Sequence, residues 1–219
     1  MRVVCSALCA AVCIAQSAPV RAEDPWSKWE AAFPTASAPQ RVYFRAHYAD
    51  ESGRAHELQV WREGDVRLRR KTDAAIDLYL EKSASGEYVY RLIDHHRGIV
   101  TRAERTTLYR IGVFADWAAL AHVLNIPRGE YAVTAPPQSE LPIRDDCRWN
   151  RLEVMTPASS ASDICWSAQW GLPLAIRTKG ESTFSVDEVR TFEPGPETFS
   201  VAPEGFLQID ADPDADVSD

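Results

Sequence analysis

The sequence contains none of the short motifs that mark common catalytic sites. There is no G-x-S-x-G, no H-E-x-x-H and no phosphate-binding P-loop among its 219 residues. The five histidines are scattered along the chain. Because catalytic groups can also be assembled from distant parts of a chain, a hydrolase stays open as an alternative. The absence of any motif nevertheless favours a protein that is not an enzyme.

An excess of positive charge is also missing. The chain has 24 lysines and arginines against 32 aspartates and glutamates, which gives a formal net charge of −8. Nucleic-acid binding normally requires a basic face, so we expect no nucleic-acid partner. No stretch beyond the first 22 residues is long and apolar enough to cross a bilayer. We therefore expect a mature chain without a transmembrane segment.

Groups of metal ligands are scarce. His95 and His96 are adjacent in sequence, so on a strand they would point to opposite faces and would seldom share one metal. Aspartates occupy every second position from Asp210 to Asp216, but the glycine and glutamate of an EF-hand calcium loop are missing there. We expect no metal and no other cofactor.

The first 22 residues have the pattern of a secretory signal. A basic residue precedes an apolar stretch at 3–15, and small residues precede a predicted cut after Ala22. This segment contains Cys5, Cys9 and Cys13. Attachment of a lipid to Cys9 or Cys13 is disfavoured, because a large residue precedes each of them. We expect a periplasmic or secreted protein.

Only two cysteines remain after this cut, Cys147 and Cys165. Two cysteines in an exported chain predict one disulfide, and two unpaired buried thiols are the alternative. The bond would close a loop of about 19 residues, which is worth on the order of 3 kcal/mol in the chain-entropy model.

Alternating apolar and polar residues predict a sheet of antiparallel hairpins. The most regular alternation runs from Ile164 to Ile176, where every second residue is apolar, and it predicts one long strand. Cys165 would lie on the face opposite the tryptophans of this strand, away from any ligand. The other expected strands lie near residues 42–48, 58–60, 66–69, 76–80, 88–93, 99–111 (a sixth and part of a seventh), 131–134, 147–154, 183–192 and 198–201.

Helical periodicity appears in two places. Residues 25–33 follow a capping Asp24 and predict a short amphipathic helix. Residues 114–126 predict a second helix, with Trp117, Leu120, Ala121 and Leu124 on one face.

The expected fold class is therefore α+β: a single, strongly curved antiparallel β-sheet, or half-barrel, with an N-terminal helix and an inserted helix against its concave face. One domain spans 23–203. Residues 204–219 form an acidic tail that we expect to be disordered.

A basic run stands out against the acidic balance of the chain. It could contact an anion such as a lipid headgroup, a phosphate or an acidic partner. It could equally be a charged outer face that keeps strands apart. The run consists of Arg62, Arg67, Arg69, Arg70 and Lys71.

Three stretches resemble the periplasmic lipoprotein-carrier (LolA/LolB-like) superfamily. They are LQVWREGDVRLRR (Leu58–Arg70), GLPLAI (Gly171–Ile176) and TFSVAPEGFLQID (Thr198–Asp210). The resemblance implies an exported protein with an N-terminal helix, an unclosed antiparallel half-barrel and a helical lid over a hydrophobic cavity. It also implies a role in lipid handling for Arg62. Because Glu63 stands where the carrier has a proline, we expect a distant relative and not the carrier itself.

These patterns predict a binding or carrier protein for an apolar ligand such as a lipid, an acyl chain or a lipoprotein. A cell-envelope protein-interaction or regulatory module is the first alternative, and an envelope hydrolase is the second. The many aromatic side chains either line a cavity under the inserted helix or fill the core. The candidate ligand-binding residues are Arg62, Trp117, Leu120, Leu124, Trp166, Trp170, Leu172 and Leu174.

Overall fold

The computed structural model describes residues 25–50, 52–110, 117–137, 141–156, 159–200 and 204–212. Its strands are β1 (Arg41–Ala49), β2 (Ala55–Glu63), β3 (Arg67–Thr72), β4 (Ile76–Lys82), β5 (Tyr88–Asp94), β6 (Ile99–Glu104), β7 (Tyr131–Thr134), β8 (Arg148–Val154), β9 (Ser160–Ser167), β10 (Leu172–Thr178), β11 (Glu181–Thr191) and β12 (Leu207–Asp210). Its helices are α1 (Pro25–Ala32), α2 (Arg105–Arg110) and α3 (Trp117–His122).

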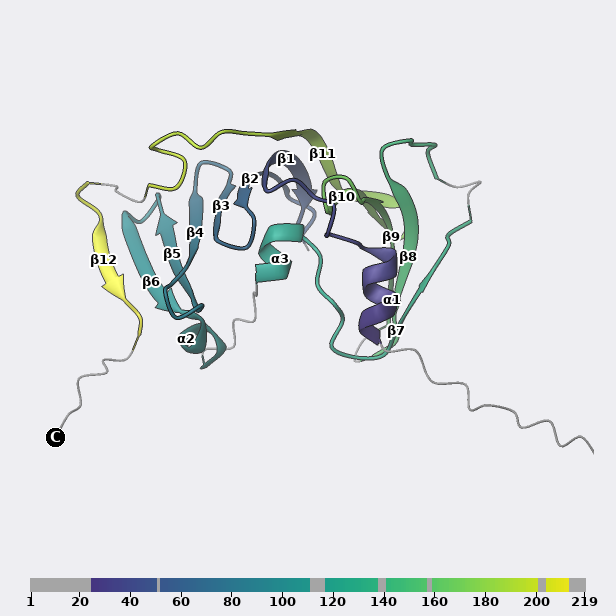
Figure 1. The fold of residues 1–219 in the computed structure, drawn as a ribbon, viewed down its shortest axis with the longest axis horizontal. Coiled ribbons are helices and arrows are strands. Elements are labelled where there is room, and N and C mark those ends of the chain that lie inside the picture. The colour runs from purple at the N-terminus through teal and green to yellow at the C-terminus, as the bar shows by residue number, and fades with distance from the viewer. Residues whose placement is uncertain are drawn as a thin grey trace, which may run out of the picture.

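All twelve strands belong to one sheet, in the order β12-β6-β5-β4-β3-β2-β1-β11-β10-β9-β8-β7. Pairing of β1 with β11 joins the N-terminal and C-terminal sets of hairpins in the middle of the sheet. Every pair is antiparallel except β12 with β6. Figure 1 shows the sheet as an open arch, with β12 and β7 at its two ends. The predicted curved sheet is confirmed, and it is antiparallel, as predicted, except at the β12–β6 pair.

The core fills the inner face of the arch beneath its centre. α3 contributes Leu120 and Ala121 to a buried cluster with residues of the central strands, among them Phe44, Val60 and Leu68. Alternation along each strand directs these side chains to the same face. A second cluster surrounds α1, where the ring of Phe33 meets Trp166 edge-on at 5.4 Å. Both helices therefore lie on the concave side (Figure 1).

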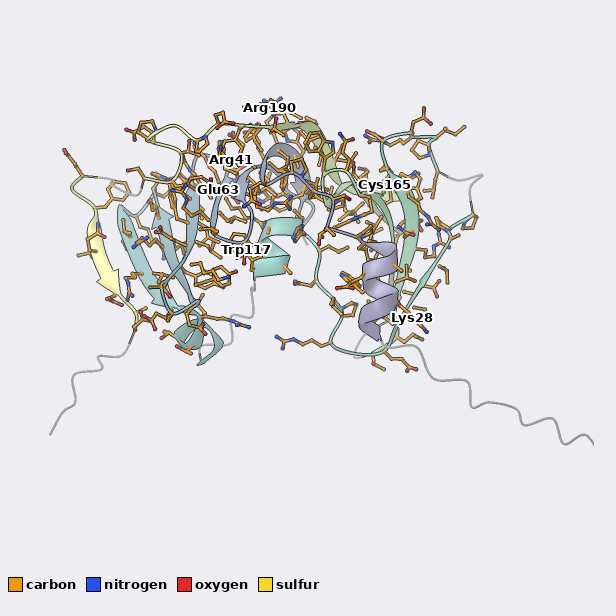
Figure 2. The ribbon with its side chains drawn as sticks, viewed as in Figure 1. Lys28, Arg41, Glu63, Trp117, Cys165 and Arg190 are labelled. Atoms are coloured by element: carbon orange, nitrogen blue, oxygen red, sulfur yellow. A yellow bond between two sulfur atoms is a disulfide. The ribbon has the colours of Figure 1, made fainter. Side chains whose placement is uncertain are left out.

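The outer face carries a row of stacked arginines and aromatic rings across five strands. The Arg190 guanidinium lies 4.5 Å from the Tyr43 ring, and Tyr43 contacts Trp61 at 5.1 Å. Arg69 lies 5.0 Å from Trp61 and 5.1 Å from Tyr79. Cation–π contacts of this kind hold the arginine guanidinium groups against the faces of the aromatic rings. Figure 2 shows Arg190 on the outside of the arch and Trp117 beneath it.

The single long strand predicted from Ile164 to Ile176 is wrong. The segment forms β9 and β10, joined by a turn at residues 168–171. Gly171 has φ +63°, a conformation that favours glycine, and its N–H donates to the carbonyl of Ser167. The four-residue turn alone would shift the alternation by one residue, because it places Ser167 beside Leu172. A register shift between Pro173 and Ala175 restores it and places Ile164 beside Ile176, so the apolar alternation in the sequence does not reveal the turn.

Two predicted boundaries near the inserted helix also change. The segment after β6 does not begin a seventh strand: it turns into α2, because β12 occupies the free edge of β6. α3 ends at His122, where Val123 has φ +61°, so Leu124 lies outside the helix. Residues 111–116, where the predicted helix begins, lie outside the described residues.

The acidic segment from residue 204 is partly a strand and not only a tail. β12 pairs in parallel with β6, and Arg102 binds Asp210 and Asp212 through Nη1 at 3.1 and 2.6 Å. The alternating aspartates, interpreted as a solvated tail, therefore supply counter-charges that attach the strand. The strand predicted at 198–201 is absent from its described part, 198–200. Residues 213–219 lie outside the described residues.

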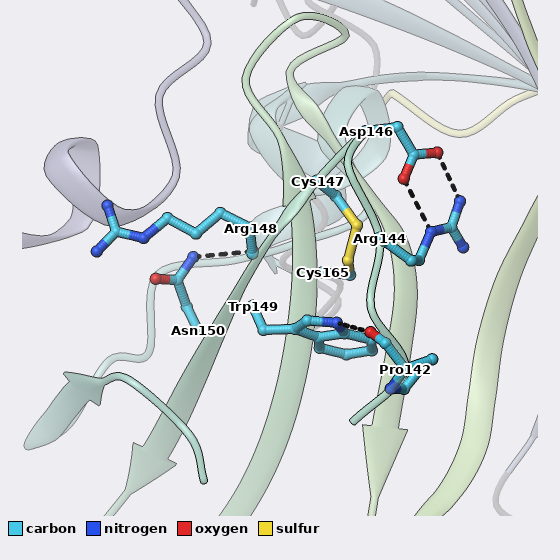
Figure 3. The surroundings of a disulfide bond; sticks show 8 residues. All are labelled: Pro142, Arg144, Asp146, Cys147, Arg148, Trp149, Asn150 and Cys165. Atoms are coloured by element: carbon cyan, nitrogen blue, oxygen red, sulfur yellow. Dashed lines mark hydrogen bonds and ion pairs between the residues drawn. A yellow bond between two sulfur atoms is a disulfide. The ribbon is translucent and has the colours of Figure 1, made fainter. Parts of the chain in front are cut away.

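The predicted disulfide between Cys147 and Cys165 is present, with the two Cα atoms 5.3 Å apart (Figure 3). It joins the residue before β8 to the neighbouring strand β9. In the sheet register Cys165 lies beside Trp149 and Ala175, whereas Trp166 lies beside Arg148 and Pro173. The bond therefore lies on the face of β9 opposite Trp166, where it fixes the start of β8.

Candidate ligand site on the concave face

The register of β3 divides the basic run between the two faces of the sheet. Arg67 and Arg69 point outward and pair with Glu63 and Asp77. Arg70 has the opposite orientation, because its neighbours in register are Val60 and Leu78. Arg62 on β2 also faces inward, beside Leu68. Two arginines of the run thus lie on the concave face, and their surroundings differ.

Arg62 is held entirely by the protein. Its side chain is 3% exposed. Its Nη1 donates to the carbonyl oxygen of Ala121 at 3.1 Å, and its Nη2 donates to the carbonyl oxygen of Trp170 at 2.9 Å. Nη1 also lies 2.8 Å from Nδ1 of His122. Burial lowers the pKa of Arg62 to about 10, so the guanidinium stays charged at neutral pH. Arg62 therefore fastens α3 and the β9–β10 turn to the sheet.

His122 completes this contact as a neutral side chain. Its Nδ1 lies 2.6 Å from the carbonyl oxygen of Gly171. Burial, together with the charge of Arg62, lowers the pKa of His122 to about 4. Protonation would place two positive charges side by side in a poorly hydrated site.

Acid should weaken the attachment of α3. The folded-state pKa of His122 is below its usual 6.5, so the unfolded chain binds more protons between these values. The stabilisation is present above pH 6.5 and is lost as the pH falls towards 4, by about 3 kcal/mol. We expect His122→Gln to lose correspondingly less stability than the wild type between pH 7 and pH 4. Urea unfolding at a series of pH values measures the difference, and parallel curves would contradict it.

Arg70 contrasts with Arg62. It is half-buried, and burial lowers its pKa. No described residue forms a hydrogen bond or an ion pair with its guanidinium. Taking an arginine out of water without a counter-charge costs free energy. Both arginines are therefore desolvated, but only Arg70 is without a hydrogen-bond acceptor among the described residues.

An apolar strip begins at this arginine. Arg70, Leu78, Leu92, Thr101 and Ile209 are successive neighbours in register on β3, β4, β5, β6 and β12, and we name them the Arg70 row. Leu92 and Ile209 are each 40% exposed. The next register position adds Ile76, Ile99 and Leu207, with Asp94 between Ile76 and Ile99. Figure 1 shows α1 at the other end of the arch and α2 at the lower end of β5 and β6.

The residues predicted to bind a ligand lie mainly within or against the buried core. Arg62 bonds to the backbone, and the others divide between the two clusters. Trp117 packs against the first cluster, stacks on Tyr88 at 5.0 Å and is half-exposed. A cavity of about 990 Å³ lies elsewhere, between α1, residues 126–135 and β8, and none of the predicted residues lines it. The first cluster buries Leu120, Leu172 and Leu174, with Trp117 and Trp170 packed against it; the second buries Trp166, with Leu124 packed against it.

The exposed residues of the Arg70 row were not predicted individually. The sequence signal for Arg70 was the basic run itself, which contains it together with Arg67 and Arg69 of the same strand. Leu92 and Ile209 could not be chosen, since nothing in the sequence pairs β12 with β6. Within the described residues, no cluster of metal-ligand side chains occurs, and no helix has the length and apolarity to span a membrane.

No protein-family model and no curated protein sequence matches the chain. Among solved structures, two crystal forms of PNGF-II are similar, with TM-scores of 0.41 and 0.43 and identities of 7% and 9%. The matches cover 78% of this chain but only 32% and 31% of the PNGF-II chains. The chain thus spans about a third of the length of these proteins, and the likeness is too low to carry an argument.

Proposed function

We propose that the protein is an exported carrier or binding protein for an anionic amphiphile, such as a fatty acid or a lipid with an acidic headgroup. The headgroup pairs with Arg70, and the acyl chain lies along the Arg70 row. The observation that carries the proposal is the half-buried guanidinium without a described partner, at the head of an exposed apolar strip.

The dimensions of the strip suit such a ligand. Neighbouring strands are about 4.8 Å apart, so the four steps from β3 to β12 span roughly 19 Å. That span is comparable to an extended long-chain fatty acid. Burial of the chain against Leu78, Leu92 and Ile209 would supply the apolar contribution. A charge-assisted hydrogen bond to Arg70 would select the acidic headgroup.

Sequence features support export and carriage. The signal-like N-terminus agrees with the disulfide, which is a bond typical of oxidising compartments. The resemblance to the LolA/LolB-like superfamily implies a lipid-handling half-barrel, and the open arch is compatible with that expectation. The resemblance implies that Arg62 contacts the ligand, whereas we assign this role to Arg70. Arg62 bonds to backbone carbonyls, and Arg70 is available to a ligand.

Calorimetric titration with three amphiphiles of equal chain length tests the proposal. The probes are dodecanoate, dodecyl maltoside and dodecyltrimethylammonium, each used below its micellar concentration. We expect dodecanoate to bind at least tenfold more tightly than the neutral probe, a difference of about 1.4 kcal/mol. The cationic probe should bind most weakly. Equal affinities for the three probes, or no binding of dodecanoate, would contradict the proposal.

A further inference from the structure

The cavity beside α1 extends along an edge of the sheet. Ten consecutive residues, 126–135, line it, and they include all of β7. α1 contributes Lys28, Ala31 and Ala32, and β8 contributes Arg148 and Asn150. In the described sheet β7 is the last strand and pairs only with β8. The cavity is therefore elongated along a strand edge and is not a closed hole in the core.

The outer edge of β7 offers backbone groups to an added strand. The Met155 N–H donates to the Glu130 carbonyl, which makes 130 and 155 a hydrogen-bonded pair. Such pairs alternate in an antiparallel ladder, so Ala132 also bonds to β8 and Val133 does not. The N–H and C=O of Val133 point away from β8. Among the described residues nothing bonds to them.

Positive charge surrounds this edge. Lys28, Arg128 and Arg148 come from three different segments, whereas Glu130 is the single acidic residue among the described lining. This excess is local, because the whole chain has a net charge of −8. Figure 3 shows the Arg148 side chain extended, and the bond drawn at this residue is donated by the amide of Asn150 to its backbone carbonyl. Its guanidinium has no partner among the described residues.

We propose that the edge of β7 binds an extended, acidic segment of a partner protein as an additional strand. Backbone bonding at Val133 supplies the pairing, as in other cases of strand addition. The cations around the cavity supply the preference for acidic side chains. The elongated lining favours a peptide over a small anion, which would need neither a strand edge nor ten consecutive residues. This site lies at the opposite end of the sheet from the Arg70 row.

Two peptides of matched strand propensity test the proposal on the full chain. The probes are Ac-VDVDVD-NH2 and Ac-VKVKVK-NH2, with affinity measured by fluorescence anisotropy and backbone contacts by NMR. We expect the aspartate peptide to bind at least tenfold more tightly and to protect the Val133 amide from hydrogen exchange. Arg148→Glu should remove most of this preference. Arg144→Glu is the control, because Arg144 pairs with Asp146 and does not line the cavity.

Each other result would overturn the proposal. Equal affinity for the two peptides would remove the charge preference. Binding of the aspartate peptide without protection of Val133 would indicate ionic contact without strand addition. An equal effect of Arg148→Glu and Arg144→Glu would place the peptide elsewhere, as would binding of dodecanoate in competition with it.

Discussion

Arg62→Leu lowers the free energy of unfolding by about 3 kcal/mol, because it leaves buried carbonyl acceptors without donors. The carbonyl oxygens of Ala121 and Trp170 keep their places when the guanidinium is removed. Relief from burying the charge offsets only part of this loss, as is usual when one partner of a buried polar contact is deleted. Chemical denaturation followed by tryptophan fluorescence measures the change.

Arg67→Leu is the matched control for this substitution. Arg67 belongs to the same basic run, but it pairs with Glu63 on the outer face and is 37% exposed. Arg67 contacts Glu63 through two nitrogens in a partly exposed ion pair, which contributes at most about 1 kcal/mol. If the two variants lost similar stability, the contact between Arg62, α3 and the β9–β10 turn would not be the main attachment of the helix.

Arg70→Met has the opposite expected effect on stability and a large effect on binding. Methionine fills similar space without a charge, so the free energy of unfolding stays the same or rises by about 1 kcal/mol. Affinity for dodecanoate falls about 10- to 100-fold, because a charge-assisted hydrogen bond is lost. Paired denaturation and calorimetric titrations of the variant measure both quantities.

The combination separates a binding role from a structural one. A structural arginine would lose stability when replaced, as Arg62 is expected to. Binding of dodecyl maltoside provides the internal control, because a neutral headgroup gains nothing from Arg70. If Arg70→Met weakened both probes equally, the variant would have altered the apolar strip and not the headgroup contact. Lower stability with unchanged dodecanoate affinity would assign Arg70 to the fold.

Local alternation predicted most of the sheet because each hairpin is encoded by neighbouring residues. The strands from β1 to β5 follow apolar alternation and turn residues. Alternation does not determine where a strand ends when a turn and a later register shift together preserve it, as they do between Ile164 and Ile176. Pairings between distant segments, such as β1 with β11 and β12 with β6, carry no local signal.

The candidate site was identified from the pairing register of the strands, which cannot be read from the sequence. Arg62 and Arg70 look alike in the basic run, and both face inward. Only their surroundings distinguish them: one donates to two backbone carbonyls, and the other meets an exposed apolar strip. Tertiary contacts of this kind depend on how α3 and the β9–β10 turn pack. The resemblance to the carrier superfamily therefore selected Arg62, the arginine that bonds to the backbone.

The position of bound dodecanoate tests the central claim most directly. NMR contacts between the ligand and the labelled methyl groups of Leu78, Leu92 and Ile209 locate the chain. The account predicts contacts along the Arg70 row, with the carboxylate end nearest Arg70. Contacts confined to Ile126 and Val133, in the cavity beside β7, would contradict it.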